Sequence, residues 1–297
     1  MMKGLYYSVV ARSKLAARSS SLAALRRALG RLPLVGGALL AAKRSAARLL
    51  LPSELTWVQV ESGLAQGLWL LLDLDVEGGY WIGAYETKVQ DLLRRLCAPG
   101  SVFYDVGTGL GFFSLAVAHR VGPQGKVFGF DPETENTRRF RQIIVRNSFQ
   151  DCVTVVDAAA WSYSRDEISF QRGGRQRTYG GVVADGVRPV LAEGEMRVVK
   201  AVSLDDFAGQ GHPAPDVIKI DVEGAECEVL RGARQIFSRA KPALICEVHH
   251  SGAADWIANW LAEVKYVADW HVPDELFPRL LFAEAAPLVW PQVAIRP

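Results

Sequence analysis

The chain has 297 residues, 49% of them hydrophobic and 22% charged, which supports a large buried core and excludes an intrinsically disordered chain. Its formal net charge of +2 hides an asymmetry, because residues 1–53 carry ten Lys/Arg and no Asp or Glu, which leaves 24 basic and 32 acidic residues elsewhere. The four cysteines form no C-x-x-C pair and lie mostly in apolar segments, so we expect buried free thiols in a reducing compartment.

Residues 1–52 form a basic arm in which Leu and Ala alternate with Arg and Lys at roughly helical spacing. Its longest uncharged stretch, residues 32–42, is far shorter than the ~20 residues that span a bilayer, so the arm is not a transmembrane helix. Three interpretations stay open: a helix on an anionic membrane surface, an organellar transit segment, or a helix packed on the domain. No secretory signal is recognisable, and we expect a cytoplasmic protein that is peripheral at the membrane if residues 1–51 bind one.

Residues 53–100 form an accessory region between the arm and the main domain. The segments "TWVQV" and "LWLLLDLDV" flank a short loop, which predicts a hairpin or two paired edge strands. The segment "KVQDLLRRL" predicts an amphipathic helix with Val89, Leu92, Leu93 and Leu96 on one face.

From residue 101 to residue 297, apolar strands alternate with amphipathic helices. The expected strands are "SVFYDV", "KVFGFD", "CVTVVDAAAW", "DVIKIDV" and "ALICEV". Such alternation predicts an α/β fold with a doubly wound, mostly parallel sheet covered by helices on both faces. The alternation lapses in residues 164–200, which contain six glycines and seven Lys/Arg. We expect a mobile basic insert there rather than core, either a solvated loop or a site for an anionic acceptor.

An acidic residue stands at or near the end of each expected strand. These residues are Asp105, Asp131, Asp157, Asp221 and Glu247. Ligands of doubly wound sheets bind at the carboxyl ends of the strands, where a carboxylate can be solvated or bound. The pattern predicts a ligand site at this edge, although any single acid can simply mark the place where polar residues resume.

The stretch "FYDVGTGLGFF" indicates which ligand this edge binds. A dinucleotide fingerprint requires G-x-G-x-x-G, but the third residue after Gly109 is Phe112, so that frame fails. The stretch instead places Asp105 before Gly107, Gly109 and Gly111. Glycines let the backbone approach a ligand closely, and the carboxylate favours a cation over a pyrophosphate. S-adenosylmethionine fits, because it carries an ammonium and a sulfonium and no phosphate.

Three more residues have places in this scheme. Asp131 ends the next strand, twenty residues after Gly111, where an acid can accept hydrogen bonds from both ribose hydroxyls. Asp157 is placed to meet the exocyclic amine of adenine, with Ala158 leaving room for the ring; the alternative is that Asp157 only caps the turn. Ribose is common to nicotinamide cofactors and S-adenosylmethionine, so Asp131 alone does not discriminate between them.

Four segments together resemble the FkbM family of S-adenosylmethionine-dependent methyltransferases over roughly residues 83–250. They are "FYDVGTGLGFFSLAVAHRVGPQGKVFGFDPETEN", "VSLDDF", "DVIKIDVEGAECEVLRGA" and "KPALICEVHH". The K-I-D-V-E-G-A-E signature is much more specific than the glycine loop. The resemblance implies a class I methyltransferase fold, Rossmann-like with seven strands of which the last is antiparallel, and commonly O-methylation of a hydroxyl.

The chain departs from the family at two places, neither of which threatens cofactor binding. Family members usually have Glu-Pro where this chain has Asp131-Pro132, and often Ala-Asn where it has Thr108-Gly109. The "GAYE" segment before the core also resembles a family segment, which implies that Tyr85 and Glu86 line the pocket. The alternative is that Glu86 only begins a helix whose cap is Thr87.

Transfer of a methyl group to a hydroxyl needs a positioned acceptor and benefits from a nearby base, since a neutral alcohol is a poor nucleophile. The candidates at the strand ends are Asp221, Glu223, Glu247, His249 and His250. We favour His249, because histidine titrates near neutrality and this residue continues the alternating face of Glu247. Lys219 shares the side of Asp221 on its strand, which predicts an ion pair. We assign no metal ligands.

The sequence therefore predicts an S-adenosylmethionine-dependent O-methyltransferase. Its expected partner is a hydroxyl acceptor, either a small molecule such as a secondary metabolite or a sugar, glycan or glycolipid. The alternatives are a nicotinamide-dependent Rossmann oxidoreductase, which the glycine frame and Asp105 disfavour, and a binding protein that keeps the fold without catalysis. No stripe of aromatic and basic residues indicates nucleic acid, and the sequence leaves the oligomeric state open.

Overall fold

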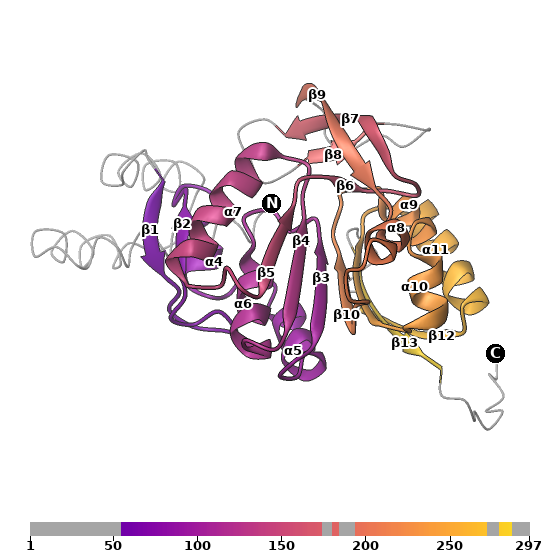
Figure 1. Ribbon diagram of the computed structural model, residues 1–297, viewed down its shortest axis with the longest axis horizontal. Helices are drawn as coiled ribbons and strands as arrows, with labels where there is room; N and C mark the ends of the chain where they lie inside the picture. Colours follow the sequence, from indigo (N-terminus) through magenta and orange to yellow (C-terminus); the bar gives the residue numbers. More distant parts are fainter. Residues whose placement is uncertain (1–54, 174–179, 184–193, 272–278, 287–297) are drawn as a thin grey trace, which may run out of the picture. The chain divides into compact units, whose positions relative to one another are not determined.

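A computed structural model of the chain describes residues 55–173, 180–183, 194–271 and 279–286 (Figure 1). The chain divides into two compact units. The first consists of residues 1–91 and 142–148, and the second of residues 92–141 and 149–297.

The main sheet of the second unit has seven strands among the described residues, in the order β12-β13-β11-β10-β3-β4-β5. These strands are β3 (Val102–Val106), β4 (Lys126–Phe130), β5 (Val153–Val156), β10 (Val217–Ile220), β11 (Ala243–Val248), β12 (Tyr266–His271) and β13 (Arg279–Ala285). The five strands from β11 to β5 are parallel, whereas β13 runs antiparallel to both β11 and β12. The predicted doubly wound sheet with an antiparallel last strand is confirmed.

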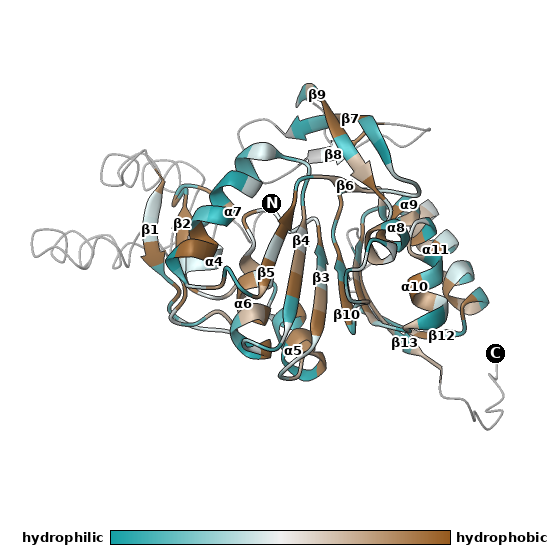
Figure 2. Ribbon diagram, in the orientation of Figure 1, coloured by the Kyte–Doolittle hydropathy of each residue, from teal (hydrophilic) through white to brown (hydrophobic). Residues whose placement is uncertain are grey.

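Alternation along the central strands directs side chains to two faces of this sheet. On one face, Tyr104 and Phe130 are buried in the same cluster as the helical residues Phe237 and Trp260. Burial of side chains of this size contributes ~1.5–3 kcal/mol each, so this cluster holds the sheet to its helices. The strands that contribute to it are largely hydrophobic along their length (Figure 2).

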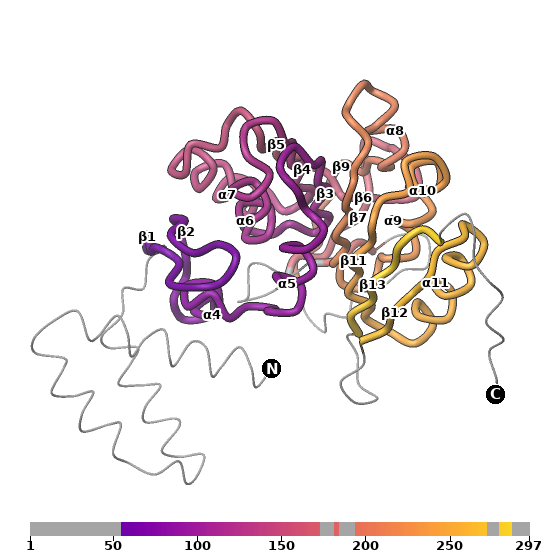
Figure 3. The backbone as a smooth tube through the Cα atoms, turned by 90° about the horizontal axis from the view of Figure 1, so that it is seen from below, coloured from indigo at the N-terminus to yellow at the C-terminus, as the bar shows by residue number. Residues whose placement is uncertain are grey.

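Helices of the second unit cover this sheet. They are α6 (Phe112–Val121), α8 (Leu204–Gly209), α9 (Glu226–Arg231), α10 (Arg234–Arg239) and α11 (Ser251–Glu263), and α7 (Thr134–Arg146) crosses the boundary between the units. Figure 3 shows α9, α10 and α11 together beside β11, β12 and β13. The helix α6 packs against β3 and β4, on the face opposite to Tyr104. The two faces are therefore both covered, as the long apolar strands predict.

The basic insert forms strands with buried side chains where the structure describes it, so the expectation that it lies outside the core is wrong for these residues. The predicted mobility of the insert stays a prediction. The strands β6 (Ala159–Ala160), β7 (Arg165–Gly173), β8 (Gly180–Val182) and β9 (Gly194–Val202) form a second sheet in the order β6-β9-β7-β8. Ile168, Phe170 and Val182 are buried in a cluster that also contains Trp161 and Ala225. The strands escaped detection because β9 exposes most of its residues and glycines lower the strand signal. Residues 174–179 and 184–193 lie outside the described residues.

The first unit contains the predicted hairpin. The strands β1 (Thr56–Gln59) and β2 (Trp69–Leu72) pair antiparallel, and α4 (Gly78–Trp81) and α5 (Thr87–Leu96) follow them. Val89, Leu92 and Leu93 of α5 are buried, which confirms the predicted apolar face. The last residues of α5 already belong to the second unit.

Two predictions about the whole chain have different outcomes. All four cysteines are free, and three of them are buried, as expected. Residues 1–52, the basic arm, lie outside the described residues, so its three interpretations stay open. In the part of the chain that the structure describes, no helix is long and apolar enough to cross a membrane.

Candidate active site

The acids predicted from the sequence gather at one edge of the main sheet. The strands β11, β10, β3, β4 and β5 are adjacent and parallel, so their carboxyl ends share that edge. Asp105, Asp131, Asp157, Asp221 and Glu247 each lie within one residue of the end of a different one of these strands. This is the edge at which doubly wound sheets bind their ligands.

The loop after β3 requires glycines for two reasons. Gly107 has a φ of +79°, and a Cβ added there would lie 1.8 Å from the backbone oxygen of Asp221, so only glycine fits. A Cβ on Gly111 would lie 2.1 Å from the ring of Phe140. Gly109 differs, because a Cβ added there would meet no atom within 4 Å. The loop therefore presents bare backbone to open space at Gly109, where a ligand can approach it.

Asp105 faces the protein interior beneath this loop. Its side chain is 1% exposed, and its Oδ2 accepts hydrogen bonds from Thr108 Oγ1 at 2.9 Å and from Ser114 Oγ at 2.7 Å. Within the described residues, its buried Oδ1 has no hydrogen-bond partner. This carboxylate fastens the loop and the first turn of α6 to β3. Its predicted contact with a ligand cation stays a prediction.

Asp131 lies beside the open part of the loop. Its Oδ2 accepts a hydrogen bond from the backbone N–H of Gly109 at 2.9 Å, and its Oδ1 accepts one from the N–H of Glu133 at 2.8 Å. Burial raises the pKa of Asp131 to about 7, although these hydrogen bonds favour the ionised form. A carboxylate in this place can accept hydrogen bonds from a ligand that also contacts Gly109.

Asp157 has an ion-pair partner on the surface of the second unit. Both of its carboxylate oxygens accept hydrogen bonds from Arg141, at 2.9 and 2.5 Å. Burial favours a higher pKa for Asp157, but Arg141 holds that pKa below its ordinary value. Ala158 next to it is buried. This ion pair favours the alternative that Asp157 supports the turn, and its contact with adenine stays a prediction.

Glu86 belongs to the first unit, whereas the other predicted site residues belong to the second. Its backbone has a φ of +40°, and its carbonyl accepts a hydrogen bond from the N–H of Gln90 at 3.1 Å. The cap position of α5 is therefore Glu86 rather than Thr87. The side chain of Gln90 donates to the carbonyls of Gly83 and Tyr85, at 3.1 and 2.6 Å, which fixes the "GAYE" segment. The role of Glu86 toward a cofactor stays a prediction.

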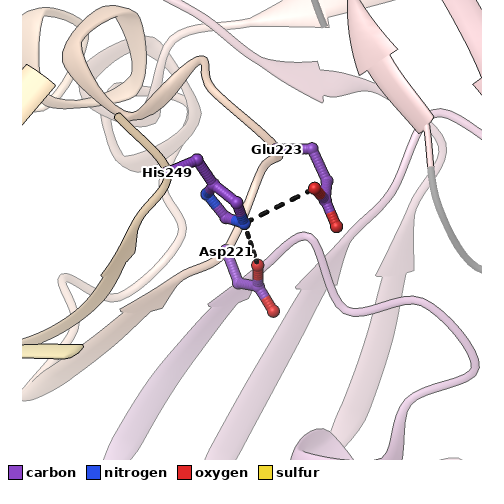
Figure 4. A group of neighbouring side chains, drawn as sticks. All are labelled: Asp221, Glu223 and His249. Carbon is purple, nitrogen blue, oxygen red and sulfur yellow. Dashed lines mark ion pairs between the residues drawn. The ribbon is translucent and has the colours of Figure 1, made fainter. Parts of the chain in front are cut away.

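A group of charged side chains forms where β10 and β11 end (Figure 4). The Nε2 atom of His249 lies 3.7 Å from Asp221 Oδ1 and 3.5 Å from Glu223 Oε2. On the other side of the ring, Nδ1 lies 2.6 Å from Glu226 Oε1. Glu226 therefore orients the ring so that Nε2 faces two carboxylates. We call Asp221, Glu223 and His249 the acid–histidine cluster.

The carboxylates around His249 change its protonation. Burial favours a lower pKa for His249, but the hydrogen bond with Glu226 and the charges of Asp221 and Glu223 raise that pKa to about 9. Burial and the charge of Asp221 raise the pKa of Glu223 to about 7. With these neighbours His249 holds its proton near neutrality, and a doubly protonated ring cannot accept another. This raised pKa disfavours His249 as the general base, and that role stays a prediction.

Two neighbours of the cluster have structural contacts. Lys219 Nζ lies 3.2 Å from Asp221 Oδ2, which confirms the predicted ion pair, and 5.1 Å from the centre of the Phe113 ring. His250 accepts a hydrogen bond on Nδ1 from the N–H of Ala253 at 3.0 Å and so caps α11. His250 therefore has a structural contact, and the catalytic roles of Asp221, Glu223, Glu247 and His249 stay predictions.

Comparison with known proteins assigns the family. A sequence model of the methyltransferase FkbM domain matches residues 105–272, which is more than half of the chain. The chain belongs to the FkbM methyltransferase family. The hexuronic acid methyltransferase AglP of Haloferax volcanii is 29% identical over 181 residues, which are 59% of this chain and 69% of that protein.

Two solved structures are similar to this FkbM methyltransferase at lower identity. The FkbM methyltransferase of Methylobacillus flagellatus is 16% identical with a TM-score of 0.45, and the match covers 72% of this chain and 56% of that one. A SAM-dependent O-methyltransferase of Thermotoga maritima is 13% identical with a TM-score of 0.41, and the match covers 70% and 68%.

This family membership makes the chain an S-adenosylmethionine-dependent methyltransferase, as the sequence predicts. The residues at the strand ends fit that cofactor. Gly109 offers exposed backbone, and Asp131 offers a buried carboxylate next to it. No comparison favours the nicotinamide-dependent oxidoreductase that we considered as an alternative.

Sequence reasoning about this FkbM methyltransferase missed three residues of the site. Glu226 is fully buried against His249, and it is the last letter of the K-I-D-V-E-G-A-E signature, so its place in that signature was the available signal. Thr108 and Ser114 bind the carboxylate of Asp105. They lie three and nine residues after Asp105, and this spacing alone does not predict that their hydroxyl groups contact its carboxylate.

Proposed function

We propose that this FkbM methyltransferase transfers the methyl group of S-adenosylmethionine to a hydroxyl oxygen of a sugar, either free or part of a glycan. The observation that carries the proposal is that the glycine loop and the acid–histidine cluster belong to adjacent strands. β3 pairs with β10 in a register that sets Asp105 opposite Lys219, and Gly107 packs against the backbone of Asp221. A cofactor on the loop is then next to an acceptor at the cluster.

Three elements of the loop region hold the cofactor in this proposal. The backbone from Gly107 to Gly111 approaches it closely, and Asp131 accepts hydrogen bonds from its ribose hydroxyls. Asp105 acts through the loop that its hydrogen bonds to Thr108 and Ser114 fasten. Asp157 and Ala158 lie at the end of the next strand, where the adenine is expected.

The acid–histidine cluster faces the acceptor in this proposal. The hydroxyl oxygen forms a bond to the methyl carbon while the bond from that carbon to sulfur breaks, and the electron pair of the broken bond stays on sulfur. The hydroxyl gives its proton to solvent water beside the cluster. Much of the rate comes from holding the oxygen in line with the sulfur–carbon bond at ~3 Å from the carbon.

The sugar acceptor is supported by the relative from Haloferax volcanii, whose name describes a hexuronic acid methyltransferase. A hexuronic acid has both hydroxyl and carboxyl oxygens, so the position of the methyl group must be measured. An ether withstands mild alkali, whereas a methyl ester is hydrolysed by it. The proposal requires the ether.

Calorimetric titration with S-adenosylhomocysteine and with NAD tests the cofactor. We expect saturable binding of the first and none of the second. Mass spectrometry of reactions with glucuronic acid, galacturonic acid and glucose then tests the acceptor, and a methylated, alkali-stable sugar supports the proposal. Binding of NAD instead would overturn the assignment of the cofactor. Transfer only to carboxyl oxygens would overturn methylation of a hydroxyl.

We also propose that residues 1–51 bring the enzyme to an anionic membrane surface, near lipid-linked glycans. The support is the composition of the arm, with ten Lys/Arg up to residue 53 and no acidic residue. Attraction of this kind contributes up to ~1 kcal/mol per basic residue near the surface and weakens with salt.

A further inference from the structure

The acid–histidine cluster has ligand separations that ordinary hydrogen bonds do not explain. The distances from His249 Nε2 to Asp221 Oδ1 and Glu223 Oε2 are 3.7 and 3.5 Å, longer than the ~2.7–3.2 Å of an N–H···O bond. Two ligand atoms that each lie ~2.0–2.2 Å from one metal ion are ~2.8–3.8 Å apart when the angle between them at the ion is about 90–120°. The three ligand atoms lie within 4.8 Å of one another.

The side chain of Glu226 supplies an independent observation. It is 0% exposed, and its Oε1 accepts hydrogen bonds from the N–H of Gly224 at 2.9 Å and from His249 at 2.6 Å. Its Oε2 is buried without a hydrogen-bond partner among the described residues. A carboxylate that fixes one ring nitrogen of a histidine, while the other nitrogen faces a cation, is the usual support of a metal-binding histidine.

The balance of charge at this place also calls for a cation. Asp221, Glu223 and Glu226 bring three carboxylates together, and Lys219 pairs with the Oδ2 atom of Asp221 rather than the Oδ1 atom that faces His249. Glu226 is fully buried, whereas the side chains of Asp221 and Glu223 are 18% and 20% exposed. With a neutral His249, Lys219 offsets one of the three negative charges, and the remaining charge is costly in this partly buried place. One divalent cation offsets two of these charges.

We propose that Asp221 Oδ1, Glu223 Oε2 and His249 Nε2 bind a divalent metal cation, which holds the acceptor's hydroxyl oxygen beside the methyl group. One imidazole nitrogen and two carboxylate oxygens suit a first-row divalent ion such as Mn²⁺, and three protein ligands leave positions for the acceptor. The role in catalysis rests on the proposed methyl transfer. The cation makes the hydroxyl more acidic, its proton passes to solvent water, and the oxygen then takes the methyl carbon as sulfur keeps the electron pair.

The competing explanation is a closed network in which a protonated His249 pairs with the three carboxylates and no metal enters. The two explanations differ in a measurement that needs no substrate. A metal site binds Mn²⁺ directly, whereas a closed ion-pair network does not bind it at micromolar concentrations.

The test is a titration of the full-length, chelator-treated protein with Mn²⁺, followed by the electron paramagnetic resonance signal of the free ion and by calorimetry. We expect one saturable site per chain. The variant Asp221→Asn should lose at least ~100-fold in affinity for Mn²⁺, because it removes a charged ligand. The variant Glu226→Gln should lose ~10- to 100-fold, because glutamine keeps a hydrogen-bond acceptor for His249 but lacks the charge. The matched control is Glu228→Gln on the same helix, whose carboxylate pairs with Arg231. It should bind Mn²⁺ as the original chain does.

Two results would overturn the proposal. One is the absence of saturable Mn²⁺ binding up to about 1 mM by a protein that still melts cooperatively, since that limit corresponds to only ~4 kcal/mol. The other is unchanged binding by a folded Asp221→Asn/Glu223→Gln double variant, which would place the ion elsewhere. S-adenosylhomocysteine binding, measured on the same samples, keeps these outcomes separate from a failure of the methyltransferase proposal.

Discussion

The glycine loop and the acid–histidine cluster lie at adjacent strand ends but are stabilised in different ways. In the loop, Asp105 and Asp131 accept hydrogen bonds from neutral donors that are near them in the chain or belong to the loop. In the cluster, His249 meets carboxylates more than twenty residues away, and charge faces charge. The loop is a local structure that the sequence encodes in one motif, whereas the cluster exists only once β10 and β11 have paired.

The largest expected effect concerns the cluster. His249→Gln should bind S-adenosylhomocysteine normally, because its side chain lies outside the glycine loop. It should turn over ~10²-fold more slowly or worse, because the amide does not replace Nε2 as a ligand of the proposed cation that positions the acceptor. His250→Gln is the matched control. It removes a helix cap, so it should retain the turnover rate and lose ~1 kcal/mol of stability. Equal rate losses in both variants would show that the cluster is not where the acceptor reacts.

The second prediction compares two glycines of the loop. Gly107→Ala forces a Cβ against the backbone of Asp221 and should lower the free energy of unfolding by ~3 kcal/mol or more. Gly109→Ala meets no protein atom, so only the positive φ costs stability, ~1 kcal/mol. Its added methyl group occupies the open space, so calorimetry should show weaker binding of S-adenosylhomocysteine. Denaturant unfolding of the pair checks the difference, and equal destabilisation would contradict it.

The third prediction concerns Asp131 and pH. The ionised carboxylate accepts ribose hydrogen bonds, so with a pKa of about 7 the dissociation constant of S-adenosylhomocysteine should rise as pH falls below that value, approaching tenfold per unit. Asp131→Asn should bind ~10- to 100-fold more weakly at pH 8 and lack this component of the pH dependence. A steep dependence that survives in the variant would assign it to another group.

The raised pKa of Asp131 also affects the stability of the unliganded protein. Because the folded-state pKa of Asp131 is raised, this group favours folding below its unfolded value of ~4 and loses that contribution as pH rises through about 7. Urea unfolding at a series of pH values measures this. Bound S-adenosylhomocysteine should reverse the trend, since it stabilises the ionised carboxylate.

The smallest expected effect on the site comes from the basic arm. Deletion of residues 1–51 should leave S-adenosylhomocysteine affinity unchanged, because every residue predicted to hold the cofactor follows residue 85 in the chain. Co-sedimentation with anionic vesicles should be salt-sensitive in the full chain and absent in the truncated one. Equal recovery of both proteins with the vesicles would favour the interpretation in which the arm packs on the domain.

The sequence predicts the main sheet well and the insert poorly. Long apolar strands such as β3 and β11 are buried on both faces, so their composition alone marks them. The strand β9 exposes Glu195, Met196 and Val198 on the surface of a small sheet, and it resembles a loop in composition. Its pairing with β7 depends on contacts across the intervening segment, which local periodicity does not report.

In the candidate site, the sequence predicts the positions of residues better than the orientation and protonation of their side chains. The motif around Asp105 predicts the loop, and the end of β4 predicts the position of Asp131. The orientation of these carboxylates was not predictable, since Asp105 turns inward only because Ser114 of α6 is there to bind it. The high pKa of His249 was also hidden, because it depends on Glu226, whose proximity to the ring requires the folded sheet.

The buried cluster of the insert is continuous with the strand end that carries the acid–histidine cluster. Ile168, Phe170 and Val182 share their cluster with Ala225 of the K-I-D-V-E-G-A-E signature. Val222, which lies between Asp221 and Glu223, packs against both this cluster and the large cluster beneath the main sheet. A change in the packing of the insert is therefore transmitted to the segment that holds Asp221 and Glu223.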